Sequence, residues 1–131
     1  MTWKLETSQC DEVRHVRFDL VPYMRGRCLD LGCGPTKAYP QFIGVDSGKD
    51  TSLFGIPMRP NINADVTDLS GFASGEYDLV FSSHTLEHIA EYRAALREWW
   101  RLVKVGGHLA LYLPHKDFYP RCGRRKEWVE W

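Results

Sequence analysis

Four short apolar runs in this chain each end in residues that can bind a polar ligand. The polar segments are Asp30-x-Gly32-x-Gly34, Asp46, Asp65 and Ser82-Ser83-His84. Carboxylates accept hydrogen bonds from hydroxyl and amino groups, and a glycine lets the backbone turn sharply and approach a ligand closely. These residue types, each placed directly after an apolar run, indicate a ligand-binding site.

Apolar runs and helical periodicity predict the elements that position these residues. Strands are expected at 28–31, 42–45, 62–64, 77–81 and 108–113. Between the last two strands, an apolar stripe at helical spacing runs through 92–103, and Gly106-Gly107 is expected to end that helix. A strand, a helix and a strand in this order predict a parallel sheet, in which ligands bind beyond the carboxyl ends of the strands. The four polar segments would then share one edge of the sheet.

The sequence predicts one α/β domain with a mainly parallel sheet of about five strands. Residues 1–26 form a lead-in with a helix over about 10–24, residues 27–114 form the core, and residues 115–131 form a tail. The chain has 131 residues, of which 44% are apolar, enough for one core. Only about ten residues separate the first two strands, which is short for a parallel crossover. Since 47–61 and 70–76 are also poor in helix signals, shortened crossover helices are expected.

Composition argues against several classes of protein. The 17 basic and 17 acidic side chains balance, which gives no electrostatic basis for nucleic acid as the main partner. No apolar run reaches the length of a membrane span, and the first residues lack a secretory pattern, so a cytoplasmic protein is expected. The four cysteines show no Cys-x-x-Cys spacing, and no metal site is expected.

The order of the segments resembles the class I S-adenosylmethionine-dependent methyltransferases, in particular the branch that acts on small molecules. The matching blocks are Leu29-Asp30-Leu31-Gly32-Cys33-Gly34, Ile43-Gly44-Val45-Asp46, Ala64-Asp65-Val66, 77–89 and 102–107. Five blocks in the family's order are far more specific than the glycine motif alone. The resemblance implies a Rossmann-like three-layer sandwich. Because no segment can be assigned to the family's final antiparallel strand pair, the chain resembles a compact or truncated member.

The resemblance also implies S-adenosylmethionine as the cofactor, with S-adenosylhomocysteine as its product. The methionine part would lie across the Gly32-Cys33-Gly34 loop, and Asp30 would hold its amino group directly or through water. Asp46-Ser47 would bind the ribose hydroxyls. In Asp65-Val66, the carboxylate would accept from the adenine amino group and the Val66 amide would donate to the ring. Ser82-Ser83 would offer backbone groups beside the sulfonium.

Some of these residues also fit purely structural roles. Asp30 fits an ordinary turn, and Asp65 fits a cap for a short helix through Asp68. His84 and His115 follow strand ends on the expected ligand side, which makes both candidate catalytic bases. His84 fits a structural role equally well, and His115 also fits a surface turn. For the neighbouring Glu87-His88 pair, a structural role is expected.

A dinucleotide-binding enzyme is a weaker interpretation. The third glycine of the Gly-x-Gly-x-x-Gly fingerprint falls on Lys37. Pro35 and Pro40 leave room for little more than one helical turn after the loop, so a pyrophosphate site on a long helix is not expected.

The predicted function is methyl transfer from S-adenosylmethionine to an oxygen, nitrogen or carbon atom of a small acceptor, by in-line displacement at the sulfonium methyl. The alternative is a non-catalytic module that binds the cofactor or a partner and lacks an acceptor site. Because the last strand is expected to have an exposed edge, a homodimer or a partner subunit covering the sheet is also expected.

Overall fold

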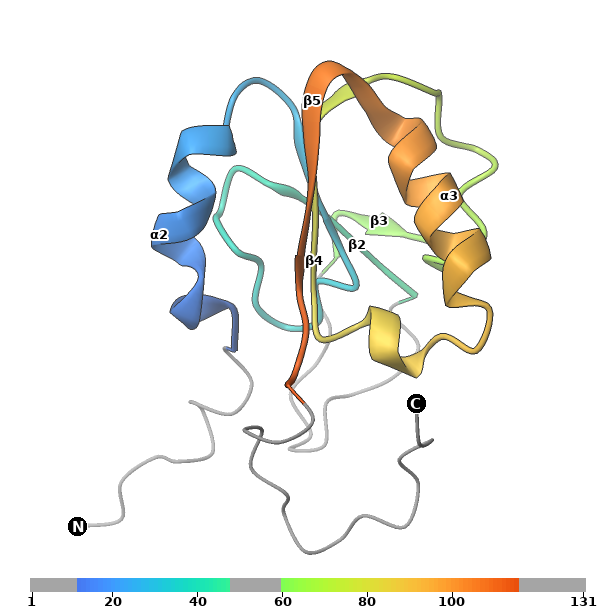
Figure 1. The fold of residues 1–131 in the computed structure, drawn as a ribbon, viewed down its shortest axis with the longest axis horizontal. Coiled ribbons are helices and arrows are strands. Elements are labelled where there is room, and N and C mark those ends of the chain that lie inside the picture. The colour runs from blue at the N-terminus through green and yellow to red at the C-terminus, as the bar shows by residue number, and fades with distance from the viewer. Residues whose placement is uncertain (1–11, 48–59, 116–131) are drawn as a thin grey trace, which may run out of the picture.

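A computed structural model describes residues 12–47 and 60–115, which contain a five-stranded sheet (Figure 1). The strands are β1 (Cys28–Leu31), β2 (Ile43–Asp46), β3 (Ile62–Asn63), β4 (Tyr77–Ser83) and β5 (Val103–Tyr112). They lie in the order β3-β2-β1-β4-β5, and every neighbouring pair is parallel. The chain order reverses between β1 and β4, so a ligand crevice belongs beyond their carboxyl ends.

Helices cover both faces of the sheet (Figure 1). On one face lie the 3-10 turn η1 (Glu12–His15), the short helix α2 (Arg17–Leu20) and the 3-10 turn η2 (Val21–Tyr23). On the other lies the single long helix of the described residues, α3 (Tyr92–Leu102). The predicted α/β three-layer arrangement, with its five parallel strands and thin helix cover, is confirmed.

The central strand β1 is buried at all four of its positions, which accounts for its apolar residues Cys28, Leu29 and Leu31. Leu29 and Leu31 pack in the same cluster as Trp99 of α3. Cys28 packs in the opposite cluster with Phe81. Asp30 alternates onto the same face as Cys28, where its buried carboxylate accepts a hydrogen bond from the Ala38 amide.

The lead-in is less regular than predicted. The expected helix over about 10–24 is wrong as a single helix, because the described part consists of η1, α2 and η2. Val16 has a non-helical φ of −121° directly before α2, and Pro22 lies within η2. A β-branched side chain restricts the helical backbone, and proline removes a helical hydrogen bond. The first residues of the predicted helix lie outside the described part of the chain.

The junction between α3 and β5 also differs from the prediction. The helix ends at Leu102 and β5 begins at Val103, so Gly106-Gly107 does not end the helix. Tyr77 pairs with Val103, whereas Leu79 pairs with His108, and the extra residues of β5 bulge out between these pairs. Gly106 has a φ of +81° in this bulge, a conformation that favours glycine.

The crossover between β1 and β2 contains no helix, not even the single turn for which the prediction left room. The Lys37 side chain stabilises this loop instead. Its Nζ donates hydrogen bonds to the Pro40 carbonyl (2.9 Å), the Phe42 carbonyl (3.0 Å) and Asn61 Oδ1 (3.0 Å). The segment 70–76 is also free of helix, as predicted. Most of the predicted loop 47–61 and of the tail 115–131 lies outside the described residues.

No helix within the described ranges is long and apolar enough to cross a membrane. β5 is the edge strand next to β4. Val105 and Leu111 are exposed on it, and Leu113 is exposed just after it. A second copy or a partner subunit over this edge stays a prediction.

Two side chains of α3 hold the loop that follows β3. The helical periodicity of the sequence did not predict these contacts. Trp99 is fully buried, and its Nε1 donates to the Val66 carbonyl at 2.9 Å. The Arg101 guanidinium donates to the Leu69 and Phe72 carbonyls at 2.9 and 2.8 Å. α3 therefore positions the segment that carries Asp65.

We expect Trp99→Phe to lower the free energy of unfolding by about 2–4 kcal/mol, because it opens a cavity and leaves the Val66 carbonyl without its donor. Trp100→Phe is the matched control, since Trp100 is 61% exposed. It should change stability by less than about 0.5 kcal/mol. Urea unfolding followed by circular dichroism compares the two, and equal losses would contradict the assignment.

Candidate functional site

The glycine loop after β1 bends back onto the end of β2. Gly32 and Gly34 have φ values of +70° and +55°. The Gly32 amide donates to the Val45 carbonyl at 2.7 Å, and the Gly34 amide donates to Asp46 Oδ2 at 2.9 Å. The loop and the Asp46 carboxylate, predicted to share a site, therefore lie in direct contact.

Asp46 is the predicted site carboxylate best placed to meet a ligand. It is partly exposed, and its Oδ1 makes no hydrogen bond to any described residue. A carboxylate oxygen so placed can accept hydrogen bonds from hydroxyl groups. Ser47 follows it and is also partly exposed. The predicted ribose contacts of this pair stay a prediction that the geometry permits.

Asp30 lies deeper. It is 2% exposed, and its Oδ2 accepts a hydrogen bond from the Ala38 amide at 2.8 Å. Burial raises the pKa of this carboxyl to about 7, and the Asp46 charge adds to the rise, while the Ala38 amide, Lys37 and Arg17 oppose it. In this structure Asp30 organises the turn that follows the glycine loop. Its predicted contact with an amino group stays a prediction.

Cys33 packs inside the loop. Burial, followed by the Asp30 and Asp46 charges, raises the pKa of its thiol to about 12. A thiol that stays protonated is a poor nucleophile. A Cβ placed on Gly44 would come within 2.8 Å of Cys33 Sγ, so Gly44 is needed to make room for the loop. Cys33 would thus contribute to a cofactor site by packing inside the glycine loop and maintaining its shape.

Thr85 was not singled out by the sequence, yet it touches the glycine loop. A Cβ on Gly32 would lie 2.2 Å from Thr85 Oγ1. The Thr85 hydroxyl is 3.1 Å from the Ser83 carbonyl and 3.4 Å from the Gly32 carbonyl. Thr85 therefore packs the end of β4 onto the loop, and only a glycine fits beneath it. A contact between segments so distant in sequence leaves no periodic signal.

The two serines at the end of β4 differ in exposure. Ser82 is 1% exposed, and its hydroxyl donates to the Leu31 carbonyl at 2.8 Å. Ser83 is partly exposed and ends the strand. The predicted use of their backbone groups beside a sulfonium stays a prediction.

Asp65 supports its own loop. Its Oδ1 accepts from the Thr67 amide at 2.9 Å and from the Thr67 hydroxyl at 2.7 Å. The loop begins beside the site, because the Ala64 amide donates to the Asp46 carbonyl at 3.0 Å. The short helix considered for this segment is absent, so Asp65 stabilises a turn and not a helix end. Its contact with an adenine amino group, and that of the Val66 amide with the ring, stay predictions.

The two candidate bases lie in different surroundings. His84 directly follows β4 with a φ of 50°, which is unusual for a residue with a side chain. Its amide donates to the Tyr112 carbonyl at 2.9 Å, and its ring lies edge-on to Tyr112 with centroids 5.1 Å apart. Burial lowers the pKa of its imidazole. His115 is exposed beyond the end of β5.

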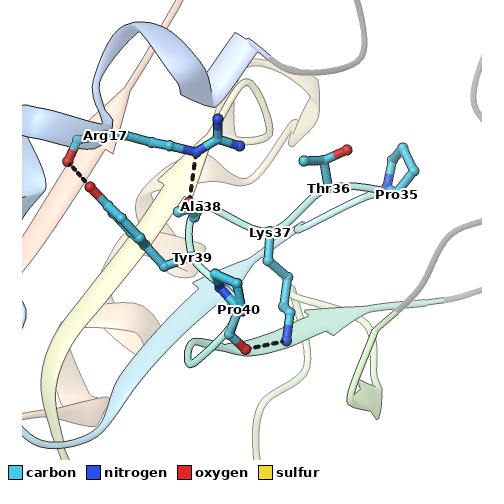
Figure 2. Close-up of a pocket in the computed structure, with 7 residues that line it drawn as sticks. All are labelled: Arg17, Pro35, Thr36, Lys37, Ala38, Tyr39 and Pro40. Carbon is cyan, nitrogen blue, oxygen red and sulfur yellow. Dashed lines mark hydrogen bonds between the residues drawn. The ribbon is translucent and has the colours of Figure 1, made fainter. Parts of the chain in front are cut away.

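A hollow of about 540 Å³ lies beside the turn that follows the glycine loop (Figure 2). It is lined by Arg17 of α2 and by residues 35–40. Arg17 Nε donates to the Ala38 carbonyl, and the Tyr39 hydroxyl donates to the Arg17 carbonyl, both at 2.7 Å (Figure 2). None of the predicted cofactor residues lines this hollow, which adjoins their loop from the α2 side.

Comparison with known proteins defines the class. A family described as "Methyltransferase domain" matches residues 29–111. The chain therefore belongs to this methyltransferase-domain family, and its resemblance to the class I S-adenosylmethionine-dependent methyltransferases is confirmed. The match runs from the second residue of β1 to the penultimate residue of β5, so it spans all five strands of the sheet.

Individual proteins of known name share less than a third of their residues with this chain over the aligned region. A trans-aconitate 2-methyltransferase of Deinococcus radiodurans is 28% identical over 103 residues, which are 71% of this chain and 39% of that protein. This chain thus spans about two fifths of the length of that relative.

Two solved structures share the fold. A protein of Pyrococcus horikoshii has a TM-score of 0.64 at 22% identity, over 89% of this chain and 58% of that one. An S-adenosylmethionine-dependent methyltransferase of Archaeoglobus fulgidus has a TM-score of 0.55 at 22% identity, over 83% of this chain and 57% of that one.

We expect Gly32→Ala to destabilise the chain more than Gly75→Ala. Both glycines have a positive φ, but nothing lies within 4 Å of a Cβ at Gly75, whereas Thr85 blocks one at Gly32. Gly75→Ala should lower the free energy of unfolding by about 1–2 kcal/mol, from backbone strain alone. Gly32→Ala should lower the free energy of unfolding by about 1–3 kcal/mol more than that, because its Cβ would clash with Thr85. Urea unfolding measures both, and the extra loss should shrink in the Gly32→Ala, Thr85→Gly double variant.

Asp30 also predicts a pH dependence of stability. Its carboxyl pKa is raised from 3.8 to about 7, so between these values the folded chain holds a proton that the unfolded chain has lost. The stability that this proton provides is fully present below about pH 4 and is lost as the pH rises to about 7.

Asp30→Asn keeps an acceptor for the Ala38 amide and removes the titration. Relative to this variant, the native chain should lose up to about 1.4 kcal/mol per pH unit between about pH 4 and 7. Urea unfolding at several pH values measures the difference, with exposed Asp19→Asn as the control. A constant difference between the native chain and Asp30→Asn would contradict the prediction.

Proposed function

We propose that this chain binds S-adenosylmethionine at the edge formed by the ends of β1, β2 and β4, and transfers its methyl group to a small-molecule acceptor. The observation that carries the proposal is the hydrogen bond from the Gly34 amide to Asp46 Oδ2, 2.9 Å long, beside the point where the strand order reverses. It joins a left-handed glycine bend to a carboxylate that retains one oxygen for a ligand. Membership of the methyltransferase-domain family supports the same conclusion.

The residues present fit this cofactor. Asp46 Oδ1 would accept hydrogen bonds from the ribose hydroxyls, and the bare Gly32 and Gly34 backbone would lie against the methionine part. Asp30 contributes negative charge below the loop, which favours the cationic ligand when this carboxyl is ionised. When bound, S-adenosylmethionine supplies a methyl group on an electrophilic sulfonium. The protein aligns an acceptor atom with that methyl and excludes water.

The acceptor is a small molecule bound beyond the end of β4. The relative from Deinococcus radiodurans is named for trans-aconitate, a small organic acid. A neutral balance of charged side chains agrees with a small ligand better than with nucleic acid. His84, which directly follows β4, is the residue positioned to meet such an acceptor, and His115 is the second candidate.

We expect Asp46→Ala to weaken S-adenosylmethionine binding by about 10- to 100-fold, the effect of losing hydrogen bonds to a charged acceptor. Asp68→Ala is the control, because Asp68 Oδ1 accepts from the Ser70 hydroxyl at 2.8 Å within its own turn. Isothermal titration calorimetry with S-adenosylmethionine and S-adenosylhomocysteine measures affinity, and circular dichroism verifies that each variant is folded.

Failure of the native chain to bind either molecule would overturn the proposal. Binding that Asp46→Ala leaves unchanged would overturn the assigned site. Binding without transfer of a tritiated methyl group to any component of a cell extract would instead favour a non-catalytic module.

A further inference from the structure

The hollow beside the turn that follows the glycine loop is large enough for a small ligand. Its volume of about 540 Å³ falls within the range of small-molecule sites in proteins. Its walls are mainly apolar, because Pro35, Ala38, Tyr39 and Pro40 line it. A ligand with an apolar body would therefore bury surface there.

The charged groups around this hollow are positive. Arg17 and Lys37 belong to its lining, and none of the described residues that line it is acidic. Burial raises the pKa of the nearby Asp30 carboxyl, and both cations oppose that rise, so their positive potential extends to the base of the glycine loop. Apolar walls strengthen such a field, because they exclude the water that would screen it. The hollow therefore favours an anion.

Arg17 is the cation whose geometry suits a ligand. The Lys37 ammonium donates to three protein oxygens, at 2.9, 3.0 and 3.0 Å, which uses all three of its N–H groups. Arg17 donates through Nε to the Ala38 carbonyl, and Figure 2 shows its terminal nitrogens turned away from that carbonyl, toward the side of Thr36. These two nitrogens form the end of the guanidinium fork, which matches the two oxygens of a carboxylate.

The Arg17 side chain is held in place by the protein itself. Besides the 2.7 Å hydrogen bond from Nε to the Ala38 carbonyl, the Tyr39 hydroxyl donates to the Arg17 carbonyl, also at 2.7 Å. Backbone and side chain of Arg17 are thus both bonded to the turn. Because a long side chain loses rotamer freedom when it binds a ligand, this anchoring reduces the entropy lost on binding.

The hollow lies next to the proposed cofactor loop. Pro35 and Thr36, which line it, directly follow Gly34. The strands β1 and β4 are neighbours, with Leu31 opposite Ser82, so the loops that follow them begin side by side. The hollow and the end of β4 therefore lie at the same edge of the sheet.

We propose that this hollow binds a carboxylate of the acceptor through Arg17, so that the acceptor is a small organic acid. This inference rests on the proposed function and adds the substrate class to it. The carboxylate in the hollow positions the acceptor and leaves another atom of the same molecule to meet the methyl group. Arg17 is thus a specificity-determining residue, which selects acceptors by their charge.

Binding to the hollow can be tested without cofactor or acceptor. Benzoate and benzamide have nearly the same shape and differ in charge, which makes them a matched pair of probes. In ¹H–¹⁵N NMR titrations, benzoate should shift the amide signals of Thr36, Ala38 and Tyr39, and benzamide should bind about tenfold more weakly. Benzoate shifts confined to other residues, or equal affinity for the two probes, would overturn the site.

The role of Arg17 is tested by substitution. Arg17→Gln should weaken benzoate binding about tenfold, because it removes the charged fork. Arg14→Gln is the matched control, since Arg14 is an exposed residue of η1 outside the lining of the hollow. Equal benzoate affinity in Arg17→Gln and the native chain would overturn the assignment. If circular dichroism shows Arg17→Gln to be unfolded, the comparison of benzoate with benzamide on the native chain decides.

A further experiment separates the acceptor from the cofactor, which has a carboxylate of its own. S-adenosylmethionine carries that group on its methionine part, whereas 5′-methylthioadenosine lacks it. In isothermal titration calorimetry, Arg17→Gln should leave the affinity for both molecules nearly unchanged. A loss of affinity for S-adenosylmethionine alone would assign Arg17 to the cofactor and overturn the inference.

The consequence for transfer is tested on the small molecules of a cell extract, separated by ion exchange into anionic, neutral and cationic fractions. We expect tritiated methyl groups to enter the anionic fraction, about tenfold more slowly with Arg17→Gln at limiting extract. Label in the neutral or cationic fraction alone would overturn the inference. S-adenosylmethionine binding with no label in any fraction would instead contradict the proposed function, and the benzoate titration would still decide whether the hollow binds a carboxylate.

Discussion

The hydrogen bond from the Gly34 amide to the Asp46 carboxylate is the contact on which the site depends. Two neighbouring parallel strands end at the same edge, but their terminal loops need not meet. Here the left-handed bend at Gly32 and Gly34 carries the backbone over the end of β2, where Val45 and Asp46 accept the loop amides. Thr85 closes the same loop from the side of β4. The edge is thus assembled from three strands around one glycine bend.

Packing explains how this edge keeps its shape with so little helix around it. In the described part of the chain, the loop between β1 and β2 has no helix to support it. The Lys37 ammonium instead donates hydrogen bonds to three oxygens of this region. The buried Asp30 carboxylate accepts a hydrogen bond from the Ala38 amide. On the opposite face, Trp99 and Arg101 of α3 donate hydrogen bonds to backbone carbonyls of the loop after β3. Hydrogen bonds from charged and indole side chains to backbone groups therefore hold these loops in place.

The sequence predicted the sheet well because its central strands are buried on both faces. The apolar runs at 28–31 and 77–81 fall on β1 and β4 for that reason. The lead-in helix and the start of β5 were predicted wrongly, because Pro22 and a bulge act locally against the apolar periodicity. The motif placed Gly34 and Asp46 together correctly. It could not find Thr85, whose contact with Gly32 depends on how two segments distant in sequence fold onto one another.

The deep position of Asp30 has a consequence for the heat of ligand binding. Its carboxyl pKa of about 7 means that a sizeable fraction of molecules carry this proton near neutrality. A cation arriving above the loop favours the ionised carboxylate and expels that proton into the medium. The released proton is taken up by the buffer, so the observed enthalpy would include the buffer's own heat of protonation. The calorimetric enthalpy should therefore change from phosphate to Tris, while the shape of the sheet edge stays the same.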